Sequence, residues 1–484
     1  MQAADSVPLA RALAQTLARS LQARLLETHI SWVLLSADTA WKIKKPVRLP
    51  FVDYSTLEFR RHFCEEELRL NRRLAPSLYL GVSRITGTPS SPVLDGPGKA
   101  QEYAVRMQRF ADGALFSEQL AAGTLQDEDV DRLAWLVAGF QRGAPVSDAT
   151  SRFALPEQRL QQALAALACT AAIAIEPEQA LLRGWLETSA AHLAPLWSTR
   201  RQSGAVREGH GDLHLDNVVK LVDGVQAFDC IEFDPALRWI DVLDEIAFSV
   251  MDFSARGRND LAFRLLNLWL DTTGDHDALP GLRFAVVYRA LVRAQVEHLR
   301  SPSVSGAARR YLDTALTWTQ AAQPRLWITH GLPGSGKTFA SQTLLQREGA
   351  IRLRSDVERK RLFGLRPLES SRGRGLDLYS ASATERTYGQ LFALARDALH
   401  AGFPVVLDAA FLRRDERKQA LMLARDLAVQ FSILHTEAPL AVLQERLMAR
   451  RADASEADIT VLEELVNGAE PLAAEELKYL VNAA

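Results

Sequence analysis

The chain has 484 residues, and its 57 basic and 59 acidic side chains nearly cancel to a net charge of −2. At about 150 residues per domain, this length predicts roughly two to four domains. An apolar fraction of 48% with 24% charged residues excludes a disordered chain, and the near-neutral charge favours small partners over nucleic acid. Three widely spaced cysteines exclude a disulfide framework and indicate a reducing, cytoplasmic location.

The first 30 residues carry leucines at a spacing of four with arginines between them. This pattern predicts an amphipathic helix and lacks the unbroken apolar core of a signal peptide. The longest uncharged apolar stretch, 163–175, is too short to span a bilayer. We therefore expect no targeting segment and no membrane partner.

Three zones follow along the chain. Residues from about 30 to 110 alternate as strands do, with one helical stretch at 55–74, and residues from about 111 to 320 are mostly helical with a strand-like island at 218–233. From residue 325 onward, strands at 326–330, 350–353, 404–407 and 429–435 alternate with helices. We expect an N-terminal domain over 1–322, with a small lobe and a helical large lobe, and a parallel α/β sheet over 323–484.

The strand at 40–44 carries two lysines that point to the same face, Lys42 and Lys44. We expect Lys42 to contact the α- and β-phosphates of a nucleotide, with Lys44 as its competitor. A glutamate on the following helix should pair with this lysine. The pattern favours Glu67, which precedes an apolar stretch, and leaves Glu66 open.

The segment His-Gly-Asp-Leu-His-Leu-Asp-Asn at 210–217 repeats the spacing of a kinase catalytic loop. Asp212 would orient or deprotonate an acceptor hydroxyl, while Asn217 and Asp229 would hold Mg²⁺. The histidines and aspartates could also be interpreted as a metal cluster, but Mg²⁺ with few oxygen ligands suits the pattern better.

A phosphate-binding loop fits GxxxxGK[ST] between an apolar strand and a helix, with the residues Gly331, Gly334, Ser335, Gly336, Lys337 and Thr338. Its glycines let backbone N–H groups and the helix N-terminus face phosphate oxygens. Lys337 would neutralise the β- and γ-phosphates, and the Thr338 hydroxyl would reach Mg²⁺. The motif predicts binding of ATP or GTP with Mg²⁺.

Other residues of this C-terminal region extend the predicted site. Asp408 ends an apolar strand and is placed to act as a carboxylate on the Mg²⁺ side. Asp356 follows another strand and could accept the proton of an acceptor hydroxyl, with Arg359 holding an anionic group of that substrate. Arg450 and Arg451 lie at helical spacing from Arg446 and could stabilise the transferred phosphoryl group from a lid, although an exposed helix face has the same pattern.

The C-terminal motifs resemble the zeta-toxin/polynucleotide-kinase-like P-loop kinases over essentially all of 325–470. The resemblance rests on Gly331–Thr338, Arg354-Ser355-Asp356, Val405–Phe411 and the stretch from Arg450 through Ser455-Glu456-Ala457-Asp458. It implies phosphoryl transfer to a hydroxyl, with Asp356 as base and Arg450 or Arg451 as the lid arginine. The family phosphorylates many unlike acceptors, so none is implied here.

The N-terminal residues resemble the aminoglycoside-phosphotransferase family of kinase-like folds over about 30–300. The whole chain is similar to bacterial bifunctional proteins that join such a domain to a P-loop, AAA-type ATP-binding domain. Two departures stand out: the turn at 35–39 contains no glycine, and Glu245-Ile246-Ala247 stands where the family commonly has Asp-Leu-Ala. No acidic cluster suits a polycationic aminoglycoside.

The expected fold is thus a bilobal protein-kinase-like domain followed by a P-loop NTPase domain with a parallel α/β sheet. The expected function is an ATP- and Mg²⁺-dependent phosphotransferase with two nucleotide sites, acting on a hydroxyl of a small metabolite or nucleotide-like acceptor. Two alternatives stay open. One module, the N-terminal one first, is a nucleotide-binding regulator of the other, or the P-loop module is a nucleic-acid end kinase.

Overall fold

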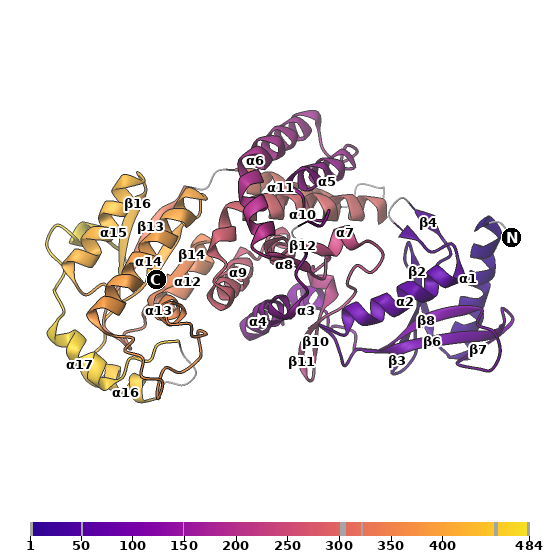
Figure 1. Ribbon diagram of the computed structural model, residues 1–484, viewed down its shortest axis with the longest axis horizontal. Helices are drawn as coiled ribbons and strands as arrows, with labels where there is room; N and C mark the ends of the chain where they lie inside the picture. Colours follow the sequence, from indigo (N-terminus) through magenta and orange to yellow (C-terminus); the bar gives the residue numbers. More distant parts are fainter. Residues whose placement is uncertain are drawn as a thin grey trace. The chain divides into compact units, whose positions relative to one another are not determined.

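The computed structural model describes residues 3–49, 52–148, 150–300, 306–320, 323–449 and 454–481 (Figure 1). Its packing divides the chain into two compact units. The first unit contains residues 1–159 and 194–249, and the second unit contains residues 160–193 and 250–484. These units are defined by packing, so the domain boundary expected after residue 322 stays a prediction.

The first unit contains a six-stranded antiparallel sheet with the order β1-β2-β3-β8-β6-β7. Its strands are β1 (Arg24–Glu27), β2 (Ser31–Leu35), β3 (Thr39–Lys44), β6 (Tyr79–Thr88), β7 (Ser91–Leu94) and β8 (Glu102–Gln108). Helix α1 (Ala3–Ser20) buries Leu13 and Leu17 against Trp32 and Ile43 of the sheet. The amphipathic helix predicted at the start of the chain is therefore confirmed up to Ser20.

Helix α2 (Leu57–Asn71) fills the stretch predicted as helical between the strands. It begins after Thr56, whose hydroxyl accepts a hydrogen bond from the backbone N–H of Phe59 at 3.1 Å. A short hairpin of β4 (Arg48–Leu49) and β5 (Val52–Asp53) precedes it. The helix packs on β8 and β6 and buries Cys64, Glu67 and Leu70, so a charged side chain reaches the interior of this unit.

Helices dominate residues 115–320, as predicted. They are α3 (Phe116–Ala122), α4 (Asp127–Gly143), α5 (Pro156–Ala168), α6 (Glu176–Gln202), α7 (Pro235–Arg238), α8 (Val242–Ala255), α9 (Asn259–Thr273), α10 (Leu279–Arg300) and α11 (Gly306–Thr319). Two antiparallel strand pairs interrupt them: β9 (Val206–Glu208) with β12 (Trp239–Asp241), and the hairpin of β10 (Val218–Leu221) with β11 (Gly224–Ala227). The strand-like island predicted at 218–233 thus forms strands only up to Ala227.

The second unit contains a five-stranded parallel sheet with the order β14-β15-β13-β16-β17. The strands are β13 (Arg325–His330), β14 (Ile351–Arg354), β15 (Val405–Asp408), β16 (Gln430–His435) and β17 (Leu480–Val481). The helices are α12 (Lys337–Glu348), α13 (Ser355–Leu362), α14 (Ala381–His400), α15 (Arg414–Asp426), α16 (Leu440–Ala449) and α17 (Ile459–Asn467). The predicted α/β alternation is confirmed, and the four predicted strands lie within a residue of their observed positions.

Helix α9 packs against α12 and the edge strand β14 within the second unit. The Asn267 side-chain amide donates to the carbonyl of Ala350 at 2.9 Å, and its oxygen accepts from the backbone N–H of Arg352 at 2.6 Å. One side chain therefore satisfies backbone groups along the open edge of the sheet, which would otherwise remain exposed for pairing.

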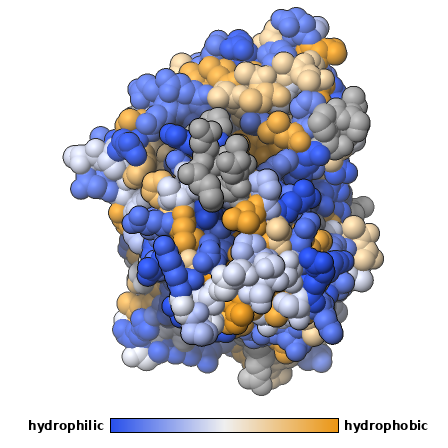
Figure 2. All heavy atoms as spheres, turned by 90° about the vertical axis from the view of Figure 1, so that its right-hand side faces the viewer, coloured by the Kyte–Doolittle hydropathy of each residue, from blue (hydrophilic) through white to orange (hydrophobic). Residues whose placement is uncertain are grey.

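The face of the first unit that Figure 2 turns toward the viewer is largely hydrophilic, with apolar side chains in small separate patches. Exposed apolar residues such as Leu26 and Val93 occur on its strands, as is ordinary for a protein surface. Within the described ranges, no helix combines the length and apolar character needed to cross a bilayer.

Candidate active sites

In the first unit, Glu67 of α2 lies between the two lysines of β3. The Nζ of Lys42 donates to its Oε1 at 2.9 Å, and the Nζ of Lys44 donates to its Oε2 at 2.7 Å. Burial by itself raises the pKa of the Glu67 carboxyl, but the two ammonium groups outweigh it and lower that pKa to about 2. Glu67 is therefore an ionised carboxylate with both oxygens paired.

The two lysines differ in what else they contact. Lys42 also pairs with Asp229, whose carboxylate is partly exposed. Lys44 is fully buried and pairs with Glu232, which also accepts a hydrogen bond from the Tyr54 hydroxyl. Lys42 thus faces the predicted metal carboxylate, while Lys44 is enclosed behind Glu67. This geometry favours Lys42 over its competitor as the phosphate ligand.

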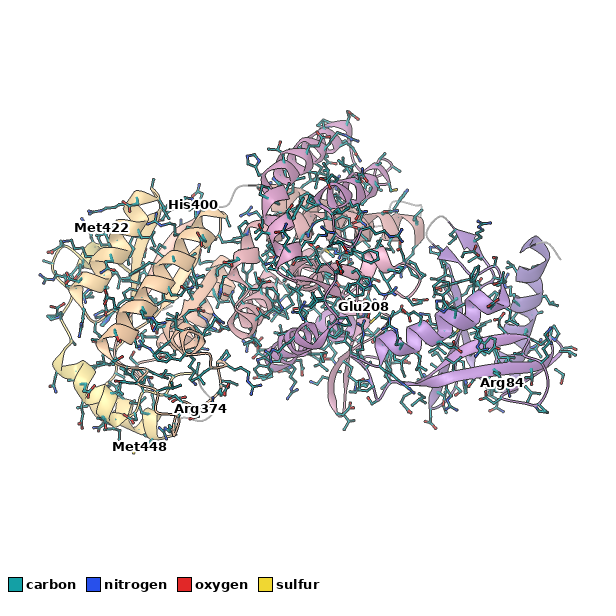
Figure 3. All side chains as sticks on the ribbon, viewed as in Figure 1. Arg84, Glu208, Arg374, His400, Met422 and Met448 are labelled. Carbon is teal, nitrogen blue, oxygen red and sulfur yellow. The ribbon has the colours of Figure 1, made fainter. Side chains whose placement is uncertain are left out.

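Glu66, the alternative partner, points elsewhere. Its carboxylate pairs with Arg69 and with Arg238 at 2.8 Å. The same two arginines also contact Glu208 of β9, at 2.7 and 3.2 Å; the side chain of Glu208 is labelled in Figure 3. Glu66 and Glu208 therefore anchor the C-terminal half of α2, and Glu67 remains the glutamate that faces the lysines.

The predicted catalytic loop brings Asp212 and Asn217 together. The Asn217 side-chain amide donates to the backbone carbonyl of Asp212 at 2.9 Å and lies 3.3 Å from its carboxylate. His214 Nε2 lies 3.4 Å from the same carboxylate. Asp229 has a φ of 66°, and its backbone N–H donates to the Tyr79 hydroxyl at 3.2 Å. The oxygen atoms of Asn217 and Asp229 are ligands of the kind that Mg²⁺ prefers.

Glu245 supports this loop, a role that the sequence did not predict. Its buried carboxylate accepts the backbone N–H groups of His210 at 2.7 Å and Gly211 at 3.2 Å. A Cβ added at Gly209 would lie 1.9 Å from Glu245 Oε2. The glycine and the carboxylate therefore fit each other.

The turn between β2 and β3 is held without glycine. The backbone N–H of Ser36 donates to the carbonyl of Thr39 at 3.0 Å. Arg109 donates from its guanidinium to the carbonyl of Ser36 at 2.6 Å and from its backbone to the carbonyl of Asp38 at 2.9 Å. This short turn is fixed by one hydrogen bond within it and by two from Arg109. A glycine-rich loop that closes over phosphates would be more flexible.

In the second unit, the phosphate-binding loop follows β13 and ends where α12 begins at Lys337. Gly334 and Gly336 have φ values of 84° and 99°, in the left-handed region. A Cβ at Gly331 would lie 2.3 Å from the carbonyl oxygen of Thr436. The ammonium of Lys337 donates to the carbonyl of Leu332 at 2.9 Å, so the lysine side chain contacts the backbone of the loop that precedes it.

The predicted metal side of this loop consists of oxygen donors. Asp408 ends β15, is 5% exposed, and accepts a hydrogen bond from the Ser341 hydroxyl at 3.0 Å. Thr338 stands in the first turn of α12. A hydroxyl and a carboxylate beside a phosphate loop suit Mg²⁺, which keeps several waters and takes few protein ligands. No group of three or more His, Cys, Asp or Glu fit to hold a metal occurs among the described residues.

A cavity of about 1380 Å³ joins these groups to the predicted acceptor residues. Members of the predicted set line it: Gly334, Ser335, Gly336, Lys337, Thr338, Asp356, Arg359 and Asp408. Arg446 also lines it and donates to the carbonyl of Gly334 at 3.0 Å. Arg450 and Arg451, the predicted lid arginines, lie outside the described residues.

Arg359 is largely buried, and the protein already satisfies part of its guanidinium. It donates to the carbonyl of Leu378 at 2.8 Å and to the Thr384 hydroxyl at 3.1 Å, and it stacks over the ring of Tyr379. Burial raises the pKa of the Tyr379 hydroxyl, and the carboxylate of Asp356 raises it further. Asp356, Arg359 and Tyr379 thus bring a carboxylate, a guanidinium and a neutral phenol to the lining of this cavity.

A histidine pair beside the phosphate loop was not predicted. His330 ends β13 and His435 ends β16, and their Nδ1 atoms are 2.8 Å apart. Burial and the neighbouring His435 lower the pKa of His330 to about 4, so its ring is neutral near pH 7. The two strands are neighbours in the sheet, which sequence spacing does not reveal.

Known proteins resemble this chain in two comparisons. Residues 326–472 match the family described as "AAA domain". Among solved structures, a choline kinase from Cryptosporidium parvum is similar at 12% identity and a TM-score of 0.38, covering 61% of this chain and 87% of that one. A gluconokinase from Sinorhizobium meliloti is similar at 16% identity and a TM-score of 0.25, covering 33% and 82%. These similarities concern the fold alone.

The C-terminal region thus combines a parallel sheet and a phosphate-binding loop with a match to the AAA family over residues 326–472. The uncharacterized protein Rv2004c of Mycobacterium tuberculosis strain H37Rv is 30% identical over 442 residues, which cover 89% of this chain and 87% of that protein. The uncharacterized protein Mb2027c of Mycobacterium bovis matches equally. The chain belongs to the family of these mycobacterial proteins.

Proposed function

We propose that the P-loop domain transfers the γ-phosphoryl group of ATP to a hydroxyl of a small metabolite or nucleotide-like acceptor. One observation carries this proposal: a single cavity is lined both by the phosphate loop and by Asp356 and Arg359. Transfer needs donor and acceptor groups in one enclosed space, because most of the catalysis is positioning and electrostatic stabilisation.

In this reaction Lys337 binds the β- and γ-phosphates, and Thr338 and Asp408 hold Mg²⁺. When bound, Mg²⁺ would neutralise part of the negative charge on the phosphates. Asp356 accepts the proton of the acceptor hydroxyl, and Arg359 binds an anionic group of the acceptor. Arg450 or Arg451 stabilises the transferred group from the lid. The reaction takes place in the cytoplasm, where ATP is abundant.

The kinase-like site is proposed as a second nucleotide site. Lys42 orients the phosphates, and Glu67 orients Lys42. Asn217 and Asp229 would hold Mg²⁺, and Asp212 is the base. The chain would then carry out two transfers, each in its own module. The contacts of Lys42 with Glu67 and Asp229 support this arrangement.

A second candidate function is that the kinase-like module binds nucleotide and regulates the other module without transferring phosphate. The glycine-free turn between β2 and β3 favours it, because this turn lacks the flexible loop that covers phosphates in active kinases. A nucleic-acid end kinase is a further candidate for the P-loop module, and salt distinguishes it. Nucleic-acid binding weakens steeply as salt rises, whereas turnover of a small acceptor does not.

The test is ATP turnover with an acceptor library in wild-type, Asp212→Asn and Lys337→Ala proteins. Asp223→Asn and Lys418→Ala, at exposed positions, are the matched controls. We expect Lys337→Ala to abolish nucleotide binding to the P-loop domain and Asp212→Asn to abolish one class of transfer. Binding that survives Lys337→Ala refutes the P-loop proposal. If every transfer activity survives Asp212→Asn, the kinase-like module is not a catalyst.

A further inference from the structure

The C-terminal turn of α9 contacts β14 and α13, the helix that begins with Ser355 and Asp356. We propose that this end of α9 holds the start of α13 in place and that Asp271 is a positioning residue for Mg²⁺ binding in the P-loop site. Helix α9 lies outside residues 326–472, which match the AAA family. The inference rests on the proposed nucleotide binding of this site.

The first contact is between Arg361 of α13 and the end of α9. The guanidinium of Arg361 donates to the backbone carbonyl of Asp271 at 2.7 Å. The carbonyls at a helix C-terminus carry a partial negative charge, so a cation is favourable there. Gly274 ends α9 with a φ of 76°, and a Cβ at this position would lie 2.6 Å from Arg361 Nε. The helix end and Arg361 therefore fit together closely.

The second contact is electrostatic. The Asp271 carboxylate is 3% exposed, and its Oδ2 lies 3.6 Å from Arg352 Nη2 and 3.8 Å from Arg354 Nη1. Both arginines are on β14. These distances exceed those of hydrogen bonds, but buried charges at this separation still interact strongly. Burial raises the pKa of the Asp271 carboxyl, and Arg352 and Arg354 oppose that rise by favouring its ionised form. The ionised carboxylate supplies a negative charge beside the two arginines.

Arg354 also faces the metal side of the site. Its Nε lies 3.9 Å from Oδ2 of Asp408, and it lines the cavity. Arg354 therefore lies near two carboxylates, that of Asp271 at its Nη1 and that of Asp408 at its Nε. If the charge of Asp271 is removed, the field of Arg354 acts more strongly on Asp408, where it competes with a bound cation. Asp271 thereby weakens the hold of Arg354 on the carboxylate that Mg²⁺ needs.

The test is Mg²⁺ titration of ATP binding by calorimetry in the full chain, comparing wild type with Asp271→Asn. We expect the Mg²⁺ concentration at half-saturation to rise roughly tenfold, a typical cost for a residue behind a metal ligand. ATP binding in EDTA should stay unchanged, and Asp271→Glu should restore much of the Mg²⁺ dependence. The control is Asp260→Asn in the first turn of the same helix, where the carboxylate pairs with Arg258 and is partly exposed.

A Mg²⁺ titration of Asp271→Asn that coincides with wild type overturns the inference. If wild type itself binds no ATP, with or without Mg²⁺, the proposed function fails instead, so the two failures are distinguishable. Should Asp271→Asn not fold, Arg361→Gln decides. It removes the contact with the α9 carbonyl from a side chain that is 31% exposed. We expect a several-fold rise in the Mg²⁺ requirement, and wild-type behaviour of this variant also overturns the inference.

Discussion

Replacing Glu67 with glutamine removes the charge that two buried lysines share. The carboxyl pKa of Glu67 falls from an ordinary 4.5 to about 2 in the folded chain. At about 1.36 kcal/mol for each tenfold change in proton affinity, this corresponds to roughly 3 kcal/mol of folding free energy at neutral pH. The variant leaves Lys42 and Lys44 without their common counter-charge, so we expect Glu67→Gln to destabilise the first unit by about 3 kcal/mol.

The direction of the pKa shift determines how the stability difference between wild type and Glu67→Gln changes with pH. Because folding depresses the pKa, the stabilisation is complete above about pH 4.5 and is lost as pH falls through 2. Urea unfolding followed by tryptophan fluorescence should show a difference between wild type and Glu67→Gln that is constant at pH 6 to 8 and shrinks below pH 4.5. Glu65→Gln is the control, since Glu65 is exposed and pairs only on the surface with Arg61. A Glu67→Gln variant as stable as Glu65→Gln would refute the reasoning.

Three further predictions concern the backbone and metal contacts. Gly331→Ala should abolish nucleotide binding by the P-loop domain in an equilibrium binding assay, because its Cβ would lie 2.3 Å from the Thr436 carbonyl oxygen; retained affinity would mean that the loop adjusts freely. Glu245→Ala should cost about 1–3 kcal/mol in chemical unfolding, because two buried N–H groups lose their acceptor; an unchanged midpoint would contradict this role. Ser341→Ala should raise the Mg²⁺ requirement of ATP binding a few-fold, since Asp408 loses one hydrogen bond, and a wild-type Mg²⁺ titration would show that Ser341 does not orient the carboxylate.

The position of α9 has a consequence for the boundaries of the P-loop domain. The helix contributes Asn267 to the edge of β14 and Asp271 to the arginines beside the site. Both residues precede the AAA match, in a stretch that the sequence assigns to the kinase-like region. A fragment that begins at residue 323 therefore leaves the edge of this sheet uncovered.

The features that could be predicted from the sequence are those that depend on residues close together in the chain. The phosphate loop could be predicted because its glycines, lysine and threonine are consecutive, and the backbone conformation that they favour creates the anion site locally. Four of the five strands of the parallel sheet were predicted to within a residue, because continuous apolar runs between helices are typical of strands buried on both faces. The two-residue strand β17 was not predicted.

Contacts between distant segments could not be predicted in this way. The period of a strand puts Lys42 and Lys44 on the same face, so their spacing cannot show which lysine faces the site; the packing of Asp229 and Glu232 around them distinguishes the two. The contact of Glu245 with the loop at 210–211 could not be predicted either, because the two are remote in sequence. His330 and His435 likewise meet because β13 and β16 are neighbours in the sheet.

The sequence by itself determined the fold class, the phosphate loop and the types of residue at both sites, because these follow from local backbone preference and hydrophobic period. The tertiary structure alone decided which charges share a buried counter-ion and which helix contacts β14 and α13 beside Asp356. Such choices depend on burial and on distances of a few ångströms between segments far apart in the chain, and at that range electrostatic energies change steeply with position.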